Sequence, residues 1–388
     1  MKIAYLTTYD VLNPSKWPKY QLGFCAAGYF LARTFGEQGV EVNYLGPLAA
    51  NNTLSTRVKR RIYTSVLKKQ YYHWTDPAVL RNYANQAVQK MSQFSSEAIL
   101  CPENSLPISY LDSQLPIILW SDATLCSLIN FYPYLSNLCQ ENFRNIVAME
   151  KAALDRCKII IYTSDWAAQA AIDIYGVEPA KVKVIPWGAN IECDRSIDDV
   201  NRIVESRDTK TCKLLFFAVD WMRKGGDVAL AVTKALNQAG LPTELTVVGC
   251  HPPESETLPD YVNVIGYINK STADGRAKLD RVLADSHFLI LPTRADCAPL
   301  VLLEANSFGV PCLTTNVGGI KTIIKDDLNG KLFELETDIS NYCTYVTNLF
   351  EHYSQYKALA NSSFHEYQMR LNWTVSAKEV KKLIMDVI

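Results

Sequence analysis

Several marks of other protein classes are missing from this sequence of 388 residues. Neither charge sign is in excess, with 39 Lys and Arg against 40 Asp and Glu, so no overall field favours nucleic acid. No apolar run approaches the roughly 20 residues of a membrane-spanning helix. The N-terminal apolar run is too short for a signal peptide and is typical of a first strand. We therefore expect a cytoplasmic protein, and peripheral contact with the inner face of a membrane stays open.

Metal and disulfide signatures are missing as well. The eleven cysteines are scattered and form no C-x-x-C pair, which favours free thiols in a reducing compartment. No two aspartates have the D-x-D spacing by which many sugar transferases hold a divalent ion, and the five histidines do not cluster. His287 lies in an apolar run, where a core histidine is favoured over a ligand. We expect no metal and no cofactor.

Two catalytic fingerprints are also absent. The first loop of the chain has no G-x-G-x-x-G, so the dinucleotide motif is not present there. The G-x-S-x-G turn of many serine hydrolases is missing, which disfavours a Ser-His-Asp hydrolase.

Short apolar runs alternate with segments of helix length, and this alternation predicts parallel sheets. The runs are residues 2–8, 40–45, 97–101, 116–120, 158–163, 182–185, 213–219, 244–249, 262–266, 288–291 and 310–315. Residues 191–212 are polar without strong periodicity and are predicted to be a linker. The pattern predicts an N-terminal domain (1–190) and a C-terminal domain (213–365), each doubly wound, and a last helix at about 366–388.

Two carboxylates flank a predicted strand-to-helix turn in the second half. Asp296 follows the run at 288–291, and Glu304 lies about two turns into the following helical segment. The carboxyl end of a parallel strand and the amides of a helix start can hold a phosphorylated ligand. Asp296 could then bind sugar hydroxyls and Glu304 a ribose. The alternative is an acidic helix start followed by an ordinary helix glutamate.

Basic and glycine-rich turns follow two other runs. Arg223 and Lys224 stand beside glycines and could neutralise phosphate charge, or they could be a solvated pair in a turn. Gly318 and Gly319 would let the backbone approach a ligand, or would form a plain turn. Asp122 follows the run at 116–120 and is either a site residue or a helix N-cap.

One segment carries a concentration of positive charge. Residues 57–69 are basic and have helical spacing. Such a segment can rest on an anionic membrane surface. The alternative is the solvated face of an ordinary helix.

These motifs, in their order and spacing, are similar to those of glycosyltransferase family 4. The motifs are residues 162–166, 184–190, 220–226, 296–304 and 315–319. The resemblance covers nearly the whole chain. It implies a retaining, metal-independent enzyme of the GT-B fold, in which two Rossmann-like domains face each other across a cleft and the last helix returns to the N-terminal domain.

The resemblance also implies roles for individual residues. Lys224 would contact the donor diphosphate, with Arg223 as a second cation. Asp296 would touch the donor sugar, Glu304 would hold the ribose, and Asp122 would occupy the position of a histidine in the N-terminal domain. Further donor-binding residues would be Ala298, Pro299 and Leu300 at the sugar and phosphate, Gly266, Tyr267 and Ile268 at the base, and Gly318 and Gly319.

The sequence departs from the family pattern at three places. Val219 stands where an arginine is expected, Asp296 is a methylene shorter than the usual glutamate, and the first loop at 21–28 has lost glycines. The first expectation is sugar transfer from a nucleoside-diphosphate donor to an acceptor hydroxyl of a sugar, lipid or small molecule. A catalytically weak or inactive nucleotide-binding protein and a sugar-nucleotide epimerase on the same scaffold remain alternatives.

Overall fold

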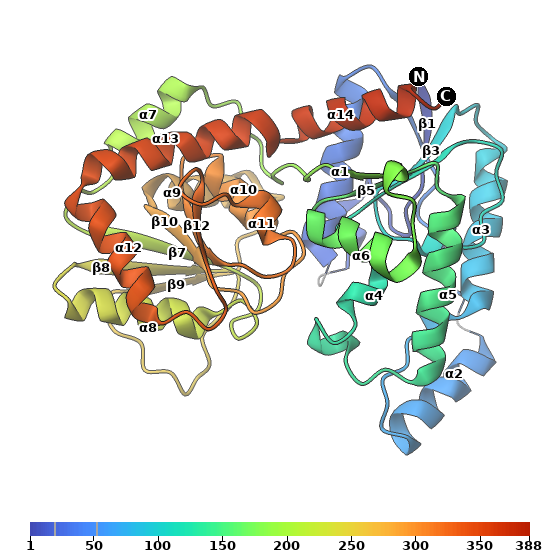
Figure 1. The fold of residues 1–388 in the computed structure, drawn as a ribbon, viewed down its shortest axis with the longest axis horizontal. Helices are drawn as coiled ribbons and strands as arrows, with labels where there is room; N and C mark the ends of the chain where they lie inside the picture. Colours follow the sequence, from blue (N-terminus) through green and yellow to red (C-terminus); the bar gives the residue numbers. More distant parts are fainter. Residues whose placement is uncertain (19–20, 52) are drawn as a thin grey trace. The chain divides into compact units, whose positions relative to one another are not determined.

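The computed structural model describes residues 1–18, 21–51 and 53–388, and the chain forms two compact units. Unit 1 comprises Met1–Trp187 and Trp373–Ile388, and unit 2 comprises Gly188–Asn372. Each unit contains a six-stranded parallel sheet surrounded by helices (Figure 1). The predicted fold class, α/β with two Rossmann-like domains, is confirmed.

Unit 1 has the strand order β2-β1-β3-β4-β5-β6. Its strands are β1 (Lys2–Tyr5), β2 (Glu41–Tyr44), β3 (Ala98–Cys101), β4 (Ile117–Ser121), β5 (Ile159–Tyr162) and β6 (Val182–Val184). Its α-helices are α1 (Leu22–Glu37), α2 (Leu54–Arg61), α3 (Pro77–Met91), α4 (Leu125–Leu128), α5 (Gln140–Arg156), α6 (Asp165–Tyr175) and α14 (Trp373–Met385). The central strands are entirely apolar and buried, as expected for a parallel sheet that is covered on both faces.

Unit 2 has the order β12-β11-β10-β7-β8-β9. Its strands are β7 (Cys212–Phe217), β8 (Thr243–Val248), β9 (Val262–Gly266), β10 (Phe288–Leu291), β11 (Cys312–Thr315) and β12 (Gly330–Phe333). Its α-helices are α7 (Ile197–Glu205), α8 (Gly226–Gln238), α9 (Ala273–Asp285), α10 (Leu300–Asn306), α11 (Ile320–Ile323), α12 (Ile339–Glu351) and α13 (Tyr353–Arg370).

The strand order of each sheet reverses beside its first strand. In unit 2 the chain runs outward from β7 through β8 and β9, and then returns to β10 on the other side of β7. In unit 1 the corresponding reversal lies between β1 and β3. Such switch points open a crevice at the carboxyl ends of the two strands, where ligands of doubly wound proteins bind.

All eleven apolar runs predicted as strands form strands, with ends that differ by a few residues. Strand β12 was missed, because it is a four-residue edge strand that begins with glycine and contains a charged residue, Lys331.

The prediction that residues 191–212 form an irregular linker is wrong. The segment contains α7, which starts with a capping box between Ser196 and Asp199 and buries Val200 and Val204 in the core of unit 2. The Ser-x-x-Asp spacing and the apolar residues four apart were the signals for this helix.

The last helix, α14, belongs to unit 1, but it begins at Trp373 and not at about residue 366, because residues 366–370 are the end of α13 in unit 2. The side chains of Gln38 and Lys381 tie α14 to the end of α1, with Lys381 Nζ 2.6 Å from the carbonyl oxygen of Gln38. Trp373 meets Trp120 edge to face, with ring centroids 5.9 Å apart. The aromatic contact buries the start of α14 against β4.

Candidate functional site

The predicted site residues of unit 2 gather at its switch point. Lys224 follows β7 and Asp296 follows β10, and these two strands are neighbours in the sheet. The Lys224 ammonium forms an ion pair with the Asp296 carboxylate. Their side chains are 12% and 8% exposed, so the alternative of a solvated basic pair is wrong for Lys224. The carboxyl ends of β7 and β10 thus carry opposite charges in contact.

Hydrogen bonds between the two turns hold this pair in place. The backbone N–H of Arg294 donates to the carbonyl of Arg223 at 2.8 Å, and Arg223 Nη1 donates to the carbonyl of Ala295 at 2.8 Å. Arg294 also pairs with Asp227 in the first turn of α8, with an Nη2 to Oδ2 distance of 2.7 Å. Because Lys224 and Asp296 lie inside this framework, their relative position is fixed by backbone contacts as well as by charge.

Two glycines allow the turns to come this close. Gly225 has φ +78°, and a Cβ at this position would lie 2.0 Å from the carbonyl oxygen of Pro292. A Cβ on Gly226 would meet the ring of Trp221 at 2.3 Å. Glycine is therefore required by both backbone conformation and space at Gly225, and by space at Gly226.

The turn after β7 concentrates positive charge. Burial lowers the pKa of Lys224, the Asp296 carboxylate raises it, and the neighbouring Arg223 guanidinium lowers it again. Arg223 is therefore close enough to act on Lys224 electrostatically. Val219, at the position where the resemblance expects an arginine, is 76% exposed. An anion at this turn would face two cations, Arg223 and Lys224, from adjacent positions in the sequence.

Glu304 lies on the buried face of α10 and is 1% exposed. Lys270 holds both of its carboxylate oxygens, with Nζ 2.6 Å from Oε1 and 2.7 Å from Oε2. Burial raises the pKa of Glu304, and the ammonium of Lys270 opposes that rise. Glu304 is thus not an ordinary, solvent-facing helix glutamate, because it is a buried acid with its own cation.

The segment predicted to line a base pocket leads directly to this pair. Gly266 ends β9, and its carbonyl accepts the N–H of Gly249 at 2.8 Å. Ile268 is buried, Tyr267 is 64% exposed, and Lys270 follows two residues later. The structure therefore brings this segment next to Glu304 through Lys270. Lys270 was not predicted from the sequence, although its place just after the segment at 266–268 was a usable signal.

The remaining turn residues lie around Asp296. Gly318 has φ +53°, and the N–H of Gly319 donates to the carbonyl of Asp296 at 3.3 Å. Helix α10 begins directly after Pro299, whose carbonyl accepts the N–H of Leu302 at 3.0 Å. Ala298, Pro299 and Leu300 form the connection between Asp296 and this helix. The turns that follow β7, β10 and β11 therefore meet, while the roles assigned to their residues stay predictions.

Asp122 belongs to unit 1 and follows β4. The alternative of a helix cap is wrong, because Thr124 caps α4 by accepting the N–H of Ser127 at 3.2 Å. The carbonyl of Asp122 accepts the hydroxyl of Thr163 at 3.5 Å. The backbone of Asp122 is thus tied to the end of β5.

A second acid of unit 1 was missed. Glu103 follows β3, is 4% exposed and accepts the backbone N–H of Thr8 at 2.7 Å and its hydroxyl at 2.5 Å. Burial raises its pKa to about 6, and the hydrogen bonds from Thr8 oppose the rise. Because Thr8 follows β1, Glu103 lies at the switch point of unit 1. Its position two residues after a predicted strand was the available signal.

Metal-binding groups give no further candidate. In residues 1–18, 21–51 and 53–388, no set of three or more His, Cys, Asp and Glu side chains could hold a metal ion. His287 is fully buried among Phe350, Tyr353 and Tyr356, which confirms that it is a core histidine. Burial lowers its pKa to about 4, so its ring is neutral at pH 7.

Comparison with known proteins shows that the second unit is similar to a family of enzymes. Residues 211–366 match the model of the family Glycosyl transferases group 1. A D-inositol 3-phosphate glycosyltransferase from Acidothermus cellulolyticus is 24% identical over 251 residues, which are 61% of this chain and 54% of that protein. A glycogen synthase from Pseudomonas fluorescens is 28% identical over 148 residues, 36% of this chain and 26% of that protein. The chain thus spans about half or less of these relatives.

Solved structures share the fold over the whole chain. WaaG, a glycosyltransferase involved in lipopolysaccharide biosynthesis, has a TM-score of 0.65 at 17% identity, with 99% of each chain covered. Anabaena Alr3699/HepE in complex with UDP-glucose has a TM-score of 0.62 at 15% identity, with 100% of each covered. These likenesses confirm the GT-B fold. The family match confirms the resemblance to glycosyltransferases, and it does not assign the chain to family 4 in particular.

Proposed function

Because residues 211–366 match the group 1 glycosyltransferases, we propose that this chain transfers a sugar from a nucleoside-diphosphate donor to an acceptor hydroxyl. The donor binds to unit 2. We further propose that the transfer retains the anomeric configuration and uses neither a metal nor a cofactor. Relatives with a glycosyltransferase name and a neighbour with bound UDP-glucose support the reaction class.

The observation that carries the proposal is the ion pair between Lys224 and Asp296 at the switch point of unit 2. A nucleoside-diphosphate sugar presents a diphosphate beside a ring of hydroxyls. Its binding site therefore needs a cation for the diphosphate and a carboxylate for the hydroxyls. Lys224 would bind the diphosphate, and Asp296 would accept hydrogen bonds from the sugar. When the donor binds, Lys224 exchanges the Asp296 carboxylate for a phosphate anion, and Asp296 exchanges the ammonium for hydroxyl donors of the sugar.

In the reaction, positive charge at the turn after β7 stabilises the leaving diphosphate. Lys224 and Arg223 supply this charge, and it acts most strongly because water is largely excluded around the buried lysine. In a front-face reaction the leaving diphosphate helps to accept the proton of the acceptor hydroxyl. Glu304 stays a hydrogen-bond acceptor for the ribose hydroxyls, because Lys270 favours its ionised form.

The same proposal assigns the acceptor to unit 1. Asp122 and Glu103 follow the neighbouring strands β4 and β3, so the carboxyl edge of that sheet offers two acids. Either acid could accept a hydrogen bond from a hydroxyl of the acceptor. Peripheral contact of residues 57–69 with a membrane is also part of the proposal, and it suits a lipid-linked acceptor.

The test is turnover of radiolabelled UDP-, GDP- and ADP-sugars, measured as transfer to added acceptors and as slow release of free sugar. We expect one donor to react, and Lys224→Ala to lower kcat by about 10²–10³, the usual effect of losing one electrostatic stabiliser. Lys234→Ala, on the following helix α8, is the control. A Lys224→Ala variant that turns over like the wild type would exclude the proposed role.

One observation favours a second candidate, a nucleotide-binding protein with weak or no transfer activity. Val219 is 76% exposed at the place where the resemblance expects an arginine, so one cation of the family pattern is missing. Val219→Arg separates the candidates: it should raise turnover if the missing charge limits the reaction. Binding of a nucleotide-sugar without turnover in either form would support the second candidate.

A further inference from the structure

Helix α2 and the π-helical turn that follows it, η3 (Ile62–Val66), expose their apolar side chains. Leu54, Val58, Ile62 and Val66 are spaced four residues apart and are 78%, 51%, 48% and 71% exposed. Residues four apart lie on one face of a helix, so these side chains form a continuous stripe. A helix that served only the core would bury such a stripe.

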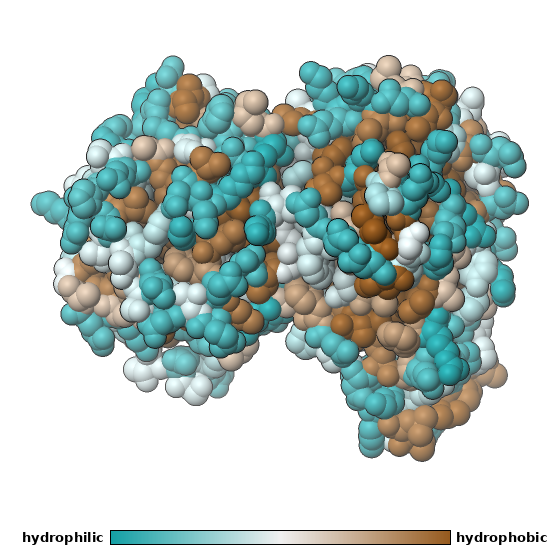
Figure 2. All heavy atoms as spheres, in the orientation of Figure 1, coloured by the Kyte–Doolittle hydropathy of each residue, from teal (hydrophilic) through white to brown (hydrophobic). Residues whose placement is uncertain are grey.

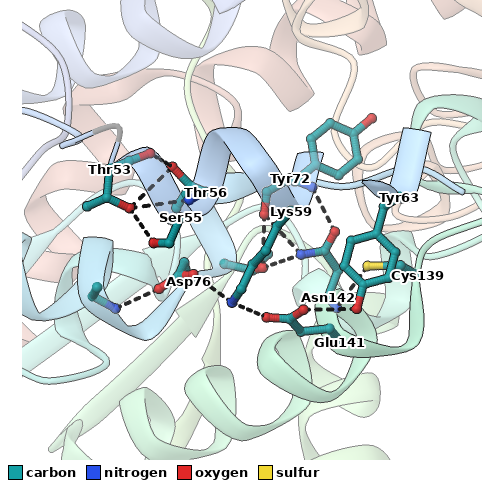
Figure 3. Close-up of polar contacts among 12 residues, drawn as sticks. Thr53, Ser55, Thr56, Lys59, Tyr63, Tyr72, Asp76, Cys139, Glu141 and Asn142 are labelled. Carbon is teal, nitrogen blue, oxygen red and sulfur yellow. Dashed lines mark hydrogen bonds and ion pairs between the residues drawn. The ribbon is translucent and has the colours of Figure 1, made fainter. Parts of the chain in front are cut away.

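The opposite face of this helix is polar and anchored to unit 1 (Figure 3). Lys59 Nζ lies 2.5 Å from Glu141 Oε1 and 3.3 Å from Asp76 Oδ2. The hydroxyl of Tyr63 donates to Glu141 Oε2 at 3.0 Å, and Thr53 caps the helix. Polar side chains thus attach the helix to the protein and leave its apolar stripe outward, the reverse of the usual arrangement.

Basic side chains lie close to the stripe in the sequence. Arg57, Arg60, Arg61 and Lys68 are exposed. No ion pair joins any of them to a carboxylate within the described part of the chain. The sequence contains no Asp or Glu between Glu41 and Asp76, so the segment carries uncompensated positive charge. In Figure 2 hydrophobic and hydrophilic spheres lie side by side at the lower end of unit 1, where Figure 1 labels α2.

Resting on the membrane contact proposed above for residues 57–69, we propose that this surface, Leu54–Val66 with its basic neighbours, docks on an anionic lipid bilayer with the helix lying in the interface plane. An apolar stripe beside uncompensated cations fits acyl chains next to anionic headgroups. Nucleic acid would leave the stripe without a function, and an apolar groove on a protein would leave the cations without one. The polar contacts of Lys59 and Tyr63 let the stripe enter the bilayer without loss of structure in unit 1.

The test is co-sedimentation of the whole chain with two kinds of vesicle. One contains only neutral phosphatidylcholine, and the other contains roughly 30% anionic phosphatidylglycerol. We expect binding to the anionic vesicles that weakens with salt. Arg57→Gln/Arg61→Gln should weaken it by about fivefold for each cation lost. Val58→Glu/Ile62→Glu should weaken it by about tenfold or more, because the stripe can no longer enter the apolar layer.

Each variant has a matched control within unit 1. Lys378→Gln/Lys382→Gln removes two exposed cations, also four residues apart, from α14. Val88→Glu/Ile174→Glu changes a valine and an isoleucine that are each 46% exposed on other helices. Both controls should bind anionic vesicles like the wild type.

Three results would overturn the proposal. They are equal binding to neutral and anionic vesicles, an equal loss of binding in the controls, and lipid-free self-association that the Val58→Glu/Ile62→Glu variant abolishes. The last result would assign the stripe to a second copy of the chain. None of these measurements depends on a donor, so failure of the membrane proposal leaves the transfer proposal separately testable.

Discussion

Lys270→Met would remove the cation of a buried acid while keeping most of the side-chain volume. In the wild type Lys270 binds both oxygens of Glu304, whose side chain is only 2% exposed. Breaking a fully buried pair costs about 3–5 kcal/mol, because the remaining charge has no partner. The Lys270 side chain is 36% exposed, so solvent screens the pair and we expect a loss of about 2 kcal/mol.

The loss should depend on pH in a defined direction. Burial already raises the pKa of Glu304 above its usual value, so folding takes up a proton and stability falls as pH rises through that window. Without Lys270 the pKa rises further and the window extends upward. The variant should therefore lose most at pH 8 and little at pH 5, where Glu304 can be protonated.

Urea unfolding at both pH values measures this difference. Lys213→Met is the matched control, since Lys213 pairs at 2.8 Å with an Asp285 side chain that is 60% exposed. An exposed pair contributes at most about 1 kcal/mol, and its loss should not depend on pH between 5 and 8. Equal losses for Lys270→Met at the two pH values would refute the assignment of Lys270 as the counter-ion of Glu304.

Two further variants test the switch points. Glu103 has a pKa raised to about 6, so wild-type stability should fall as pH rises from about 4.5 through 6. In urea titrations Glu103→Gln should therefore be more stable than the wild type by about 2 kcal/mol at pH 8 and equally stable at pH 4.5. An effect that does not depend on pH would contradict this. Gly225→Ala should lose about 3 kcal/mol or more, since left-handed backbone conformation and contact with Pro292 both oppose a Cβ. Gly176→Ala, at φ +63° with nothing within 4 Å, should lose only about 1–2 kcal/mol, and equal losses would exclude the contact as a cause.

The sheets could be predicted from sequence because buried parallel strands are continuous apolar runs, such as Ile159–Tyr162. Edge strand β12 and helix α7 were harder. A four-residue strand with glycine and lysine resembles a loop, and the polar residues of α7 hide its narrow apolar stripe. Tertiary packing decides both cases.

The candidate site was predictable where residues follow strands directly. Lys224, Asp296 and Gly319 were expected near one another because the carboxyl ends of parallel strands share one edge of the sheet. The counter-ion Lys270 was not predicted, because it does not follow a strand directly: it lies four residues beyond the end of β9, in the connection to α9. Sequence spacing alone does not give such a contact.

The switch point of unit 2 as a donor site is tested most directly by calorimetric titration with UDP, GDP and ADP. We predict that one of these nucleotides binds at about one site per chain. The folded Lys224→Met variant should bind it about tenfold or more weakly. Binding of no nucleotide, or equal affinity for wild type and Lys224→Met, would contradict the assignment of this site.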